Sequence, residues 1–128
     1  MTVNAYNAGM AATTIVVQRS APDRVKGCCQ PVAAPLPDAR VDELSQVYRA
    51  LGDATRVQIV HILTAAAEPV CVCDFTAAFE LGQPTVSHHL ARLREAGIVT
   101  STKQGVWAFY QLNPEMGAAA RAAVQLIG

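Results

Sequence analysis

Between residues 38 and 96, the apolar positions recur at the three- and four-residue spacing of α-helices. The first apolar stripe predicts a helix over residues 38–52, ended by Gly52, and consists of Val41, Leu44, Tyr48 and Leu51. A second stripe predicts a helix that Asp53 caps and that ends by Pro69. Its expected buried side carries Val57, Val60 and Leu63, with Ile59 and Ile62 beside them.

Two further helices follow at close spacing. Residues 71–80 predict a short helix that Leu81-Gly82 closes. The next helix covers residues 83–96, with Pro84 in its first turn, where the missing N–H costs nothing. Its expected core face is Val86, Leu90 and Leu93, and Gly97 is its C-terminal stop.

After Gly97, the spacing of the apolar residues changes from the helical to the strand pattern. Residues 98–112 hold the strand formers Val99, Val106, Trp107, Phe109 and Tyr110, and Lys103-Gln104-Gly105 predicts a tight turn between them. This pattern indicates a β-hairpin. Asn113-Pro114-Glu115 predicts the start of a last helix, with a capping side chain, a proline and an acid in the first turn. The order of elements is typical of a winged helix-turn-helix, a mainly α fold with a β-hairpin.

Residues 1–37 show no sustained period and contain several prolines and glycines. They predict an irregular or mobile arm, in which residues 13–18 are the one candidate for a short strand. The expected division is therefore a flexible arm over 1–37, which carries Cys28 and Cys29, and a winged helix-turn-helix domain over 38–128.

The composition limits the class of protein. A chain of 128 residues is enough for one domain, and with 52% hydrophobic but only 5% aromatic residues its core must be built from small aliphatic side chains. No apolar run approaches a membrane span, and the N-terminus lacks the pattern of a secretory signal. We therefore expect a cytoplasmic protein without membrane contact, whose four cysteines bind metal or act in redox chemistry.

Charge is unevenly distributed, although the formal net charge is zero. Residues 1–37 carry +2, residues 38–80 carry −4, and residues 81–128 carry +2. The segment that contains the helix over 83–96 is thus locally positive. Any affinity for DNA should be modest and strongly dependent on salt.

Several strings together resemble the ArsR/SmtB family of bacterial metal-responsive repressors. They are YRALGDATRVQIVHIL at 48–63, CVCDF at 71–75, QPTVSHHLARLREAGIV at 83–99 and GVWAFYQL at 105–112. The resemblance implies a homodimer that binds a palindromic operator near a resistance operon and that metal releases from the DNA. It also implies a regulator and not an enzyme.

Two departures from the family pattern refine this expectation. Related recognition helices often carry serine where this chain has Gly82, which offers no hydroxyl to a phosphate. The last helix lacks the Asp and His ligands of the family's zinc and cobalt sensors, since Ala118-Ala119-Ala120 has no donor atoms. The resemblance therefore disfavours a zinc sensor of that branch.

The cysteines form two clusters, Cys28-Cys29 and Cys71-Val72-Cys73, and thiolates select soft or borderline ions. At a helix start, the macrodipole should lower the thiol pKa. Residues two apart on a regular helix do not share a face. Either the segment around Cys71 precedes the helix, or only one cysteine of that pair binds, or the turn distorts.

The resemblance places the first helix across the dimer interface, so the arm could bring Cys28 and Cys29 over the partner's cysteines. Our hypothesis is a shared site with Cys28 and Cys29 from one chain and Cys71, Cys73 or both from the other. Three thiolates suit trivalent arsenic or antimony, whereas four suit Cd(II) or Pb(II). The vicinal pair favours arsenite or antimonite as inducer.

The helix over 83–96 should lie in the major groove of double-stranded operator DNA. Its polar face is Gln83, Thr85, Ser87, His88 and Arg92. We expect Ser87 and His88 near bases and Arg92 on a phosphate. Lys103 and Gln104, at the hairpin tip, should touch the backbone or the minor groove.

The sequence does not fix the roles of three further residues. One of His88 and His89 should be exposed and the other packed. Arg56 either reaches the DNA backbone or pairs with acids of the first two helices.

Two other classes of protein could use these cysteines. An enzyme, with the cysteines as a redox couple or nucleophile, lacks a phosphate loop after a strand and the two-spacer dithiol motif. A winged-helix regulator that senses redox state through the same cysteines stays an alternative. In the metal-sensing account, an ion that pulls on the short helix over 71–80 tilts the next helix and resets the spacing of the two recognition helices.

Overall fold

The computed structural model describes residues 3–4, 15–16 and 32–128, which fall into two compact units, Met1–Glu43 and Leu44–Gly128. In the first unit, β1 (Val3–Asn4) pairs antiparallel with β2 (Ile15–Val16). The strand expected within residues 13–18 is therefore present as β2. Cys28 and Cys29 lie outside the described residues, and the division into an arm over 1–37 and a domain over 38–128 stays a prediction.

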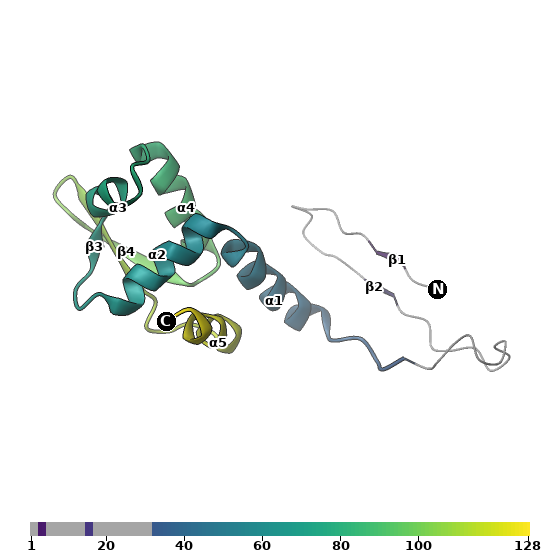
Figure 1. Ribbon diagram of the computed structural model, residues 1–128. Coiled ribbons are helices and arrows are strands. Elements are labelled where there is room, and N and C mark those ends of the chain that lie inside the picture. Colours follow the sequence, from purple (N-terminus) through teal and green to yellow (C-terminus); the bar gives the residue numbers. More distant parts are fainter. Residues whose placement is uncertain (1–2, 5–14, 17–31) are drawn as a thin grey trace, which may run out of the picture. The chain divides into compact units, whose positions relative to one another are not determined.

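The helices and strands follow the predicted order (Figure 1). Helix α1 (Asp38–Leu51) begins in the first unit and ends in the second. The remaining elements are α2 (Ala54–Ala65), β3 (Val70–Cys71), α3 (Val72–Phe79), α4 (Gln83–Glu95), β4 (Val99–Gln104), β5 (Trp107–Leu112) and α5 (Ala118–Ile127). This architecture is the winged helix-turn-helix, mainly α with a β-hairpin, that the sequence predicts.

The three strands of the second unit form one antiparallel sheet in the order β3-β5-β4. In the hairpin, Val99 lies opposite Leu112 and Gln104 lies opposite Trp107. Gly105 has a φ of +64°, a conformation that glycine adopts without steric cost, and it forms the turn together with Val106. The turn therefore begins later than predicted, because Lys103 and Gln104 are the last paired residues of β4.

The core lies where α2 contacts α4, α5 and β5. Its largest fully buried side chains are Phe75, Ile59, Leu90, Leu93, Ile98, Val60, Val86 and Val99. The predicted core face of α4 is confirmed, and each of its leucines contributes about 1.5–3 kcal/mol through burial. Helix α4 ends at Glu95, Ala96 caps it, and Gly97 follows with a φ of +77°.

Two predicted buried faces are wrong in part. On α1 the buried residues are Val47 and Ala50, whereas Tyr48 is 65% exposed. On α2, Ile59 replaces Val57 on the buried side, because that helix is apolar around most of its circumference and the spacing alone did not fix its orientation. Periodicity finds such helices more reliably than it orients them.

Two predicted boundaries are also wrong. The segment predicted as a helix over 71–80 begins with a short strand, because Val70 and Cys71 pair with Tyr110 and Phe109 of β5. The last helix begins at Ala118, not at Asn113. The Asn113 side chain instead accepts a hydrogen bond from the Glu115 amide at 2.9 Å and donates one to the Gly97 carbonyl, also at 2.9 Å.

Within the described residues, no helix is both long and apolar enough to span a membrane. Helix α3 ends at Phe79, and Glu80 caps it in the left-handed conformation with a φ of 54°. Only Leu81 and Gly82 then separate this residue from α4. The N-terminus of α3 and the helix expected to contact DNA are thus joined by one short helix and a tight turn.

Candidate thiolate site and nucleic-acid interface

Cys71 caps the N-terminus of α3 with its own side chain. Its backbone is extended, with φ −73° and ψ 147°, and its sulfur accepts a hydrogen bond from the Cys73 amide at 3.4 Å. In return, the Asp74 carboxylate accepts a hydrogen bond from the Cys71 amide at 3.3 Å. This reciprocal arrangement has the form of a capping box, with a sulfur in the place of the usual hydroxyl oxygen.

The cap brings the two sulfurs together. Cys73 Sγ lies 2.7 Å from Cys71 Sγ, although the residues are only two apart in sequence. A regular helix would point them to different faces. Since Cys71 lies before the helix and in an extended conformation, the first of the three predicted arrangements is the one observed.

The two thiols differ in exposure. Cys71 is buried, whereas Cys73 is exposed and faces solvent. The hydrogen bond with Cys71 raises the pKa of the Cys73 thiol, and desolvation and the neighbouring negative groups raise it further. The expectation that the helix macrodipole lowers this pKa is therefore wrong for Cys73, because the contact between the sulfurs outweighs the dipole of an eight-residue helix.

The described residues supply only part of a metal site. Over residues 32–128 and the two short strands, no group of three or more His, Cys, Asp or Glu side chains is placed to hold a metal ion. The convergent pair Cys71 and Cys73 fits a thiophilic ligand that binds two adjacent sulfurs. Any third sulfur at this pair would come from residues outside this part of the chain or from a second copy.

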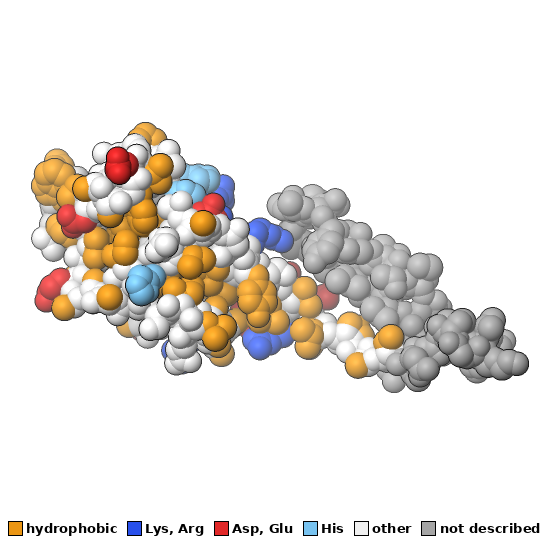
Figure 2. Space-filling model, viewed as in Figure 1, with side chains coloured by type: hydrophobic (Ala, Val, Ile, Leu, Met, Phe, Trp, Pro, Cys, Tyr) orange, Lys and Arg blue, Asp and Glu red, His pale blue; other side chains and the backbone are white. Residues whose placement is uncertain are grey.

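Helix α4 presents most of its predicted DNA-contacting residues to solvent. Gln83, Thr85 and His88 are exposed, and Ser87 is half-buried. Arg92 is exposed and forms an ion pair with Glu95 at 3.0 Å on the same helix. Figure 2 shows histidine side chains next to basic ones over α4. The exposed face therefore has the donors that bases and phosphates require.

The hairpin tip carries the other two predicted contacts. Lys103 and Gln104 are exposed at the end of β4. Val106 is 86% exposed and Trp107 is 55% exposed beside them. Figure 2 shows a group of hydrophobic side chains at the left, where the hairpin ends in Figure 1.

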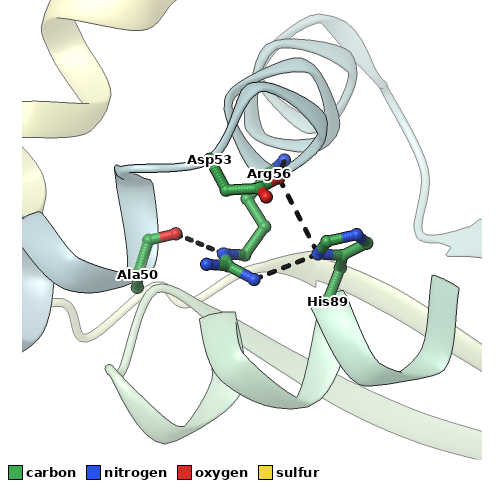
Figure 3. A network of polar contacts seen from close by, with 4 residues as sticks. All are labelled: Ala50, Asp53, Arg56 and His89. Carbon is green, nitrogen blue, oxygen red and sulfur yellow. Dashed lines mark hydrogen bonds and ion pairs between the residues drawn. The ribbon is translucent and has the colours of Figure 1, made fainter. Parts of the chain in front are cut away.

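A polar network joins three helices behind the exposed face of α4 (Figure 3). Asp53 caps α2 by accepting a hydrogen bond from the Arg56 amide at 3.1 Å. The Arg56 side chain donates from Nε to the Ala50 carbonyl of α1 at 2.6 Å, and its Nη1 lies 3.0 Å from Nδ1 of His89 on α4. Of the paired histidines, His89 is thus the packed one and His88 the exposed one, as expected.

The sequence indicates Asp53, Arg56 and His89 as individual polar residues, but it does not predict their contacts with one another. The Arg56 guanidinium contacts a carbonyl and an imidazole rather than a carboxylate, so the predicted pairing with an acidic side chain is not the contact observed. The predicted contact of Arg56 with the DNA backbone stays a prediction. Its hydrogen bond to the Asp53 carboxylate comes from the backbone amide and, together with the charge of Arg56, lowers the Asp53 pKa. A cleft of about 410 Å³ adjoins the network and is lined by Gln46, Arg49, Ala50, Arg56, Arg92, Glu95 and Ala96.

Comparison with known proteins identifies the family. The model of the arsR family of bacterial regulatory proteins matches residues 53–101, which include the Cys71–Cys73 pair and all of α4. The arsenical resistance operon repressor of Staphylococcus xylosus is 38% identical over 73 residues, which are 57% of this chain and 68% of that protein. This chain belongs to the ArsR family.

Other relatives agree with this assignment. The arsenic resistance transcriptional regulator ArsR1 of Pseudomonas putida is 44% identical over 70 residues, 55% of this chain and 54% of that protein. The chain thus spans about half the length of that relative. The solution structure of the homodimeric winged helix-turn-helix domain Mb0332 of Mycobacterium bovis has a TM-score of 0.58 at 27% identity, covering 70% of this chain and 81% of the other.

The family is one of transcriptional regulators and not of enzymes. The matched segment contains the thiolate pair and the helix-turn-helix but ends before α5. It also excludes residues 28 and 29.

Proposed function

We propose that this ArsR-family chain is a homodimeric repressor that binds operator DNA through α4 and releases it when trivalent arsenic or antimony binds to its cysteine thiolates. The observation that carries the proposal is the convergence of Cys71 Sγ and Cys73 Sγ at 2.7 Å, on the helix that leads into α4. The names of the relatives from Pseudomonas putida and Staphylococcus xylosus support arsenic as the inducing element.

The proposed inducer site contains three sulfurs. Cys71 and Cys73 supply two, and the third comes from Cys28 or Cys29 of the partner copy. Each As–S bond that forms replaces an As–O bond of arsenite, and the thiol proton leaves with that oxygen as water. Four sulfurs would instead suit Cd(II) or Pb(II), so sulfur count and inducer identity are linked.

A homodimer is supported by two exposed apolar side chains on helices at the ends of the domain. Tyr48 on α1 is 65% exposed and Leu126 on α5 is 90% exposed. Both side chains are available for burial against another copy. The homodimeric winged helix-turn-helix domain from Mycobacterium bovis has the same fold.

The proposed switch acts through α3. Ligand bonds to Cys71 Sγ and Cys73 Sγ replace the sulfur cap of α3 and pull its N-terminus towards the partner's cysteines. Because α3 packs against α4 and only a tight turn joins them, a tilt of α3 moves α4. A coupling free energy of about 1–3 kcal/mol is sufficient, and operator DNA must weaken arsenite binding by the same factor.

The test combines DNA binding with ligand titration. A labelled duplex is first obtained by in vitro selection with the wild-type protein, and arsenite or Cd(II) is then titrated into the complex. We expect arsenite to lower duplex affinity about 5- to 150-fold in wild type and to have no effect in the C71S or C73S variant. Ala77→Ser, an exposed change on the same helix, should respond like wild type.

Single Cys28→Ser and Cys29→Ser variants test the shared site. Because either cysteine could replace the other, the double variant Cys28→Ser/Cys29→Ser decides the question: if it binds arsenite and responds like wild type, the arm contributes no sulfur and the shared site is wrong. X-ray absorption of the arsenite-loaded protein then counts the sulfurs directly, and three As–S contacts are expected. Four sulfurs around cadmium, with no response to arsenite, would favour the cadmium and lead alternative.

Redox sensing is the second candidate, and the adjacency of the two sulfurs at 2.7 Å is the observation that favours it. In that case hydrogen peroxide, with no metal added, should release the selected duplex from wild type and not from Cys73→Ser. Release by arsenite under strictly reducing conditions, without any effect of peroxide, excludes this candidate.

A further inference from the structure

Arg56 ties the end of α1 to the middle of the DNA-contacting helix. The Ala50 carbonyl belongs to the last turn of α1, where backbone carbonyls have no partner within the helix. Arg56 Nε donates to that carbonyl at 2.6 Å, while Nη1 reaches His89 Nδ1 at 3.0 Å. One planar guanidinium thus spans α1 and α4, and its position is fixed by α2, on which it lies (Figure 3).

The contact with His89 requires a neutral imidazole. Arginine donates and cannot accept, so His89 Nδ1 must offer its lone pair and carry its ring proton on Nε2. A protonated His89 would place an N–H and a second positive charge 3.0 Å from the Arg56 guanidinium. The contact would then be repulsive.

A second partner for His89 lies close by. Asp53 Oδ1 is 3.8 Å from His89 Nδ1, and the His89 side chain is only 13% exposed. The groups that face His89 are Arg56 and Asp53 from α2 and His88 from its own helix, whose ring centroid is 6.0 Å away. Arg49 of α1 and Arg92 and Glu95 of α4 line the adjoining cleft. Protonation therefore exchanges a bond to Arg56 for an ion pair with Asp53.

We propose that Arg56 and His89 are positioning residues for DNA recognition: their hydrogen bond sets the orientation of α4 relative to the end of α1, and it holds only while His89 is neutral. Neither residue needs to touch DNA in this role. Protonation of His89 releases α4 from α1 and weakens sequence-specific binding. The inference rests on the proposed function, because it assumes that α4 contacts an operator.

Replacement of His89 separates positioning from electrostatic contact. His89→Leu removes the acceptor and keeps a side chain of similar bulk, whereas His89→Asn retains an acceptor near the position of Nδ1. At pH 8, we expect His89→Leu to bind the selected duplex about tenfold more weakly, the order of coupling seen between contacting residues, and His89→Asn to restore most of that affinity. Binding to an unselected duplex, and the dependence on salt, should not change.

A lost phosphate contact gives a different result. If Arg56 held the DNA backbone, Arg56→Lys would retain most of the affinity, and Arg56→Gln would weaken selected and unselected duplexes equally and reduce the salt slope by about one. We expect instead that Arg56→Lys and Arg56→Gln both lose affinity for the selected duplex only. Equal loss on both duplexes would overturn the positioning role.

The pH profile tests the protonation step. Histidine side chains ordinarily change charge between pH 5 and 8, so the affinity of wild type for the selected duplex is measured from pH 8 to pH 5.5. We expect the affinity ratio of wild type to His89→Leu to fall from about ten towards one as the pH falls. His61→Leu, an exposed change on α2, should keep the profile of wild type.

The outcomes distinguish this inference from the proposed function. If selection with wild type enriches no DNA sequence, the proposed function fails. If a sequence is enriched but His89→Leu binds it within twofold of wild type, or if their affinity ratio is independent of pH, the inference alone fails. Circular dichroism of each variant establishes that it is folded under the conditions of the binding assay.

Discussion

Two helices of the DNA-binding domain, α2 and α3, begin with a side-chain cap, and the two caps use different acceptor atoms, an oxygen and a sulfur. Asp53 caps α2 with an oxygen that accepts the Arg56 amide at 3.1 Å. Cys71 caps α3 with a sulfur that accepts the Cys73 amide at 3.4 Å. Aspartate is among the most favourable residues at this position, whereas sulfur is a weak acceptor.

Because oxygen is the stronger acceptor, we expect the two caps to differ in how readily another ligand replaces them. The Asp53 cap is reinforced by the hydrogen bond from the Arg56 amide and by the charge of Arg56, which both lower the Asp53 pKa, so it resists exchange for another ligand. The Cys71 cap has little hydrogen-bond energy to lose, and its sulfur already lies beside that of Cys73. A soft ligand can therefore replace it at small cost. One cap stabilises the junction with α4, and the other leaves α3 free to respond.

The largest expected effect separates ligand binding from stability. Cys73→Ser should weaken arsenite binding about 100-fold or more, since even outer-shell partners of bound ions are worth 10- to 100-fold. Because Cys73 is exposed, the free energy of unfolding should change by no more than about 0.5 kcal/mol. Isothermal titration and urea unfolding measure the two quantities. Unchanged arsenite affinity would show that Cys73 is not a ligand.

We expect Asp53→Ala to have the opposite pattern to Cys73→Ser, with a loss of stability and little change in arsenite binding. Loss of the cap should lower the free energy of unfolding by about 1–2 kcal/mol, measured by urea unfolding at pH 7. Arsenite affinity should stay within threefold of wild type, because the thiolate pair is on another helix. A variant of full stability with impaired arsenite binding would reverse the assignment of the two caps.

The pH dependence of stability sharpens the contrast further. The folded state holds the Asp53 pKa below its ordinary value of 3.8. The stabilisation is therefore fully present above about pH 4 and is lost as the pH falls through the lowered pKa. Asp53→Asn keeps a capping oxygen without the charge. Its deficit relative to wild type, measured by unfolding at pH 6 and at pH 3, should be smaller at pH 3. An equal deficit at both values would mean that the charge contributes nothing.

The smallest effect concerns the sulfur cap itself. In Cys71→Ser a hydroxyl replaces the thiol at a position that favours serine. We expect the free energy of unfolding to be unchanged or to rise by up to about 0.5 kcal/mol, while arsenite binding is lost. A decrease of more than about 1 kcal/mol in urea unfolding would show that the thiol packs α3 rather than keeping its cap weak.

Much of the fold could be predicted from local patterns. The apolar spacing located α1, α2 and α4, and Asp53 and Gly97 act at helix ends as expected. Short elements were predicted less well, because two paired residues, as in β3, leave no periodicity. Asn113 followed by proline and glutamate is compatible with a helix start and with an isolated turn. The turn forms because the Asn113 side chain donates a hydrogen bond to the carbonyl of Gly97, 16 residues earlier.

In the candidate site, too, some features could be predicted from the sequence and others depend on how the helices pack. The thiolate pair and the exposed residues of α4 are contiguous in sequence, so their types and spacing point to them directly. The partnership of Arg56 with His89 joins residues 33 positions apart and depends on how three helices pack. The raised pKa of Cys73 likewise follows from where the two sulfurs lie, which the spacing of the cysteines does not determine.

Release of DNA by arsenite tests the central claim most directly. Fluorescence anisotropy of the selected duplex bound to wild type, and to Cys73→Ser, is followed under reducing conditions as arsenite is added. The account predicts dissociation from wild type and persistent binding by the variant. A wild-type complex whose affinity for the duplex is unchanged at saturating arsenite would contradict it.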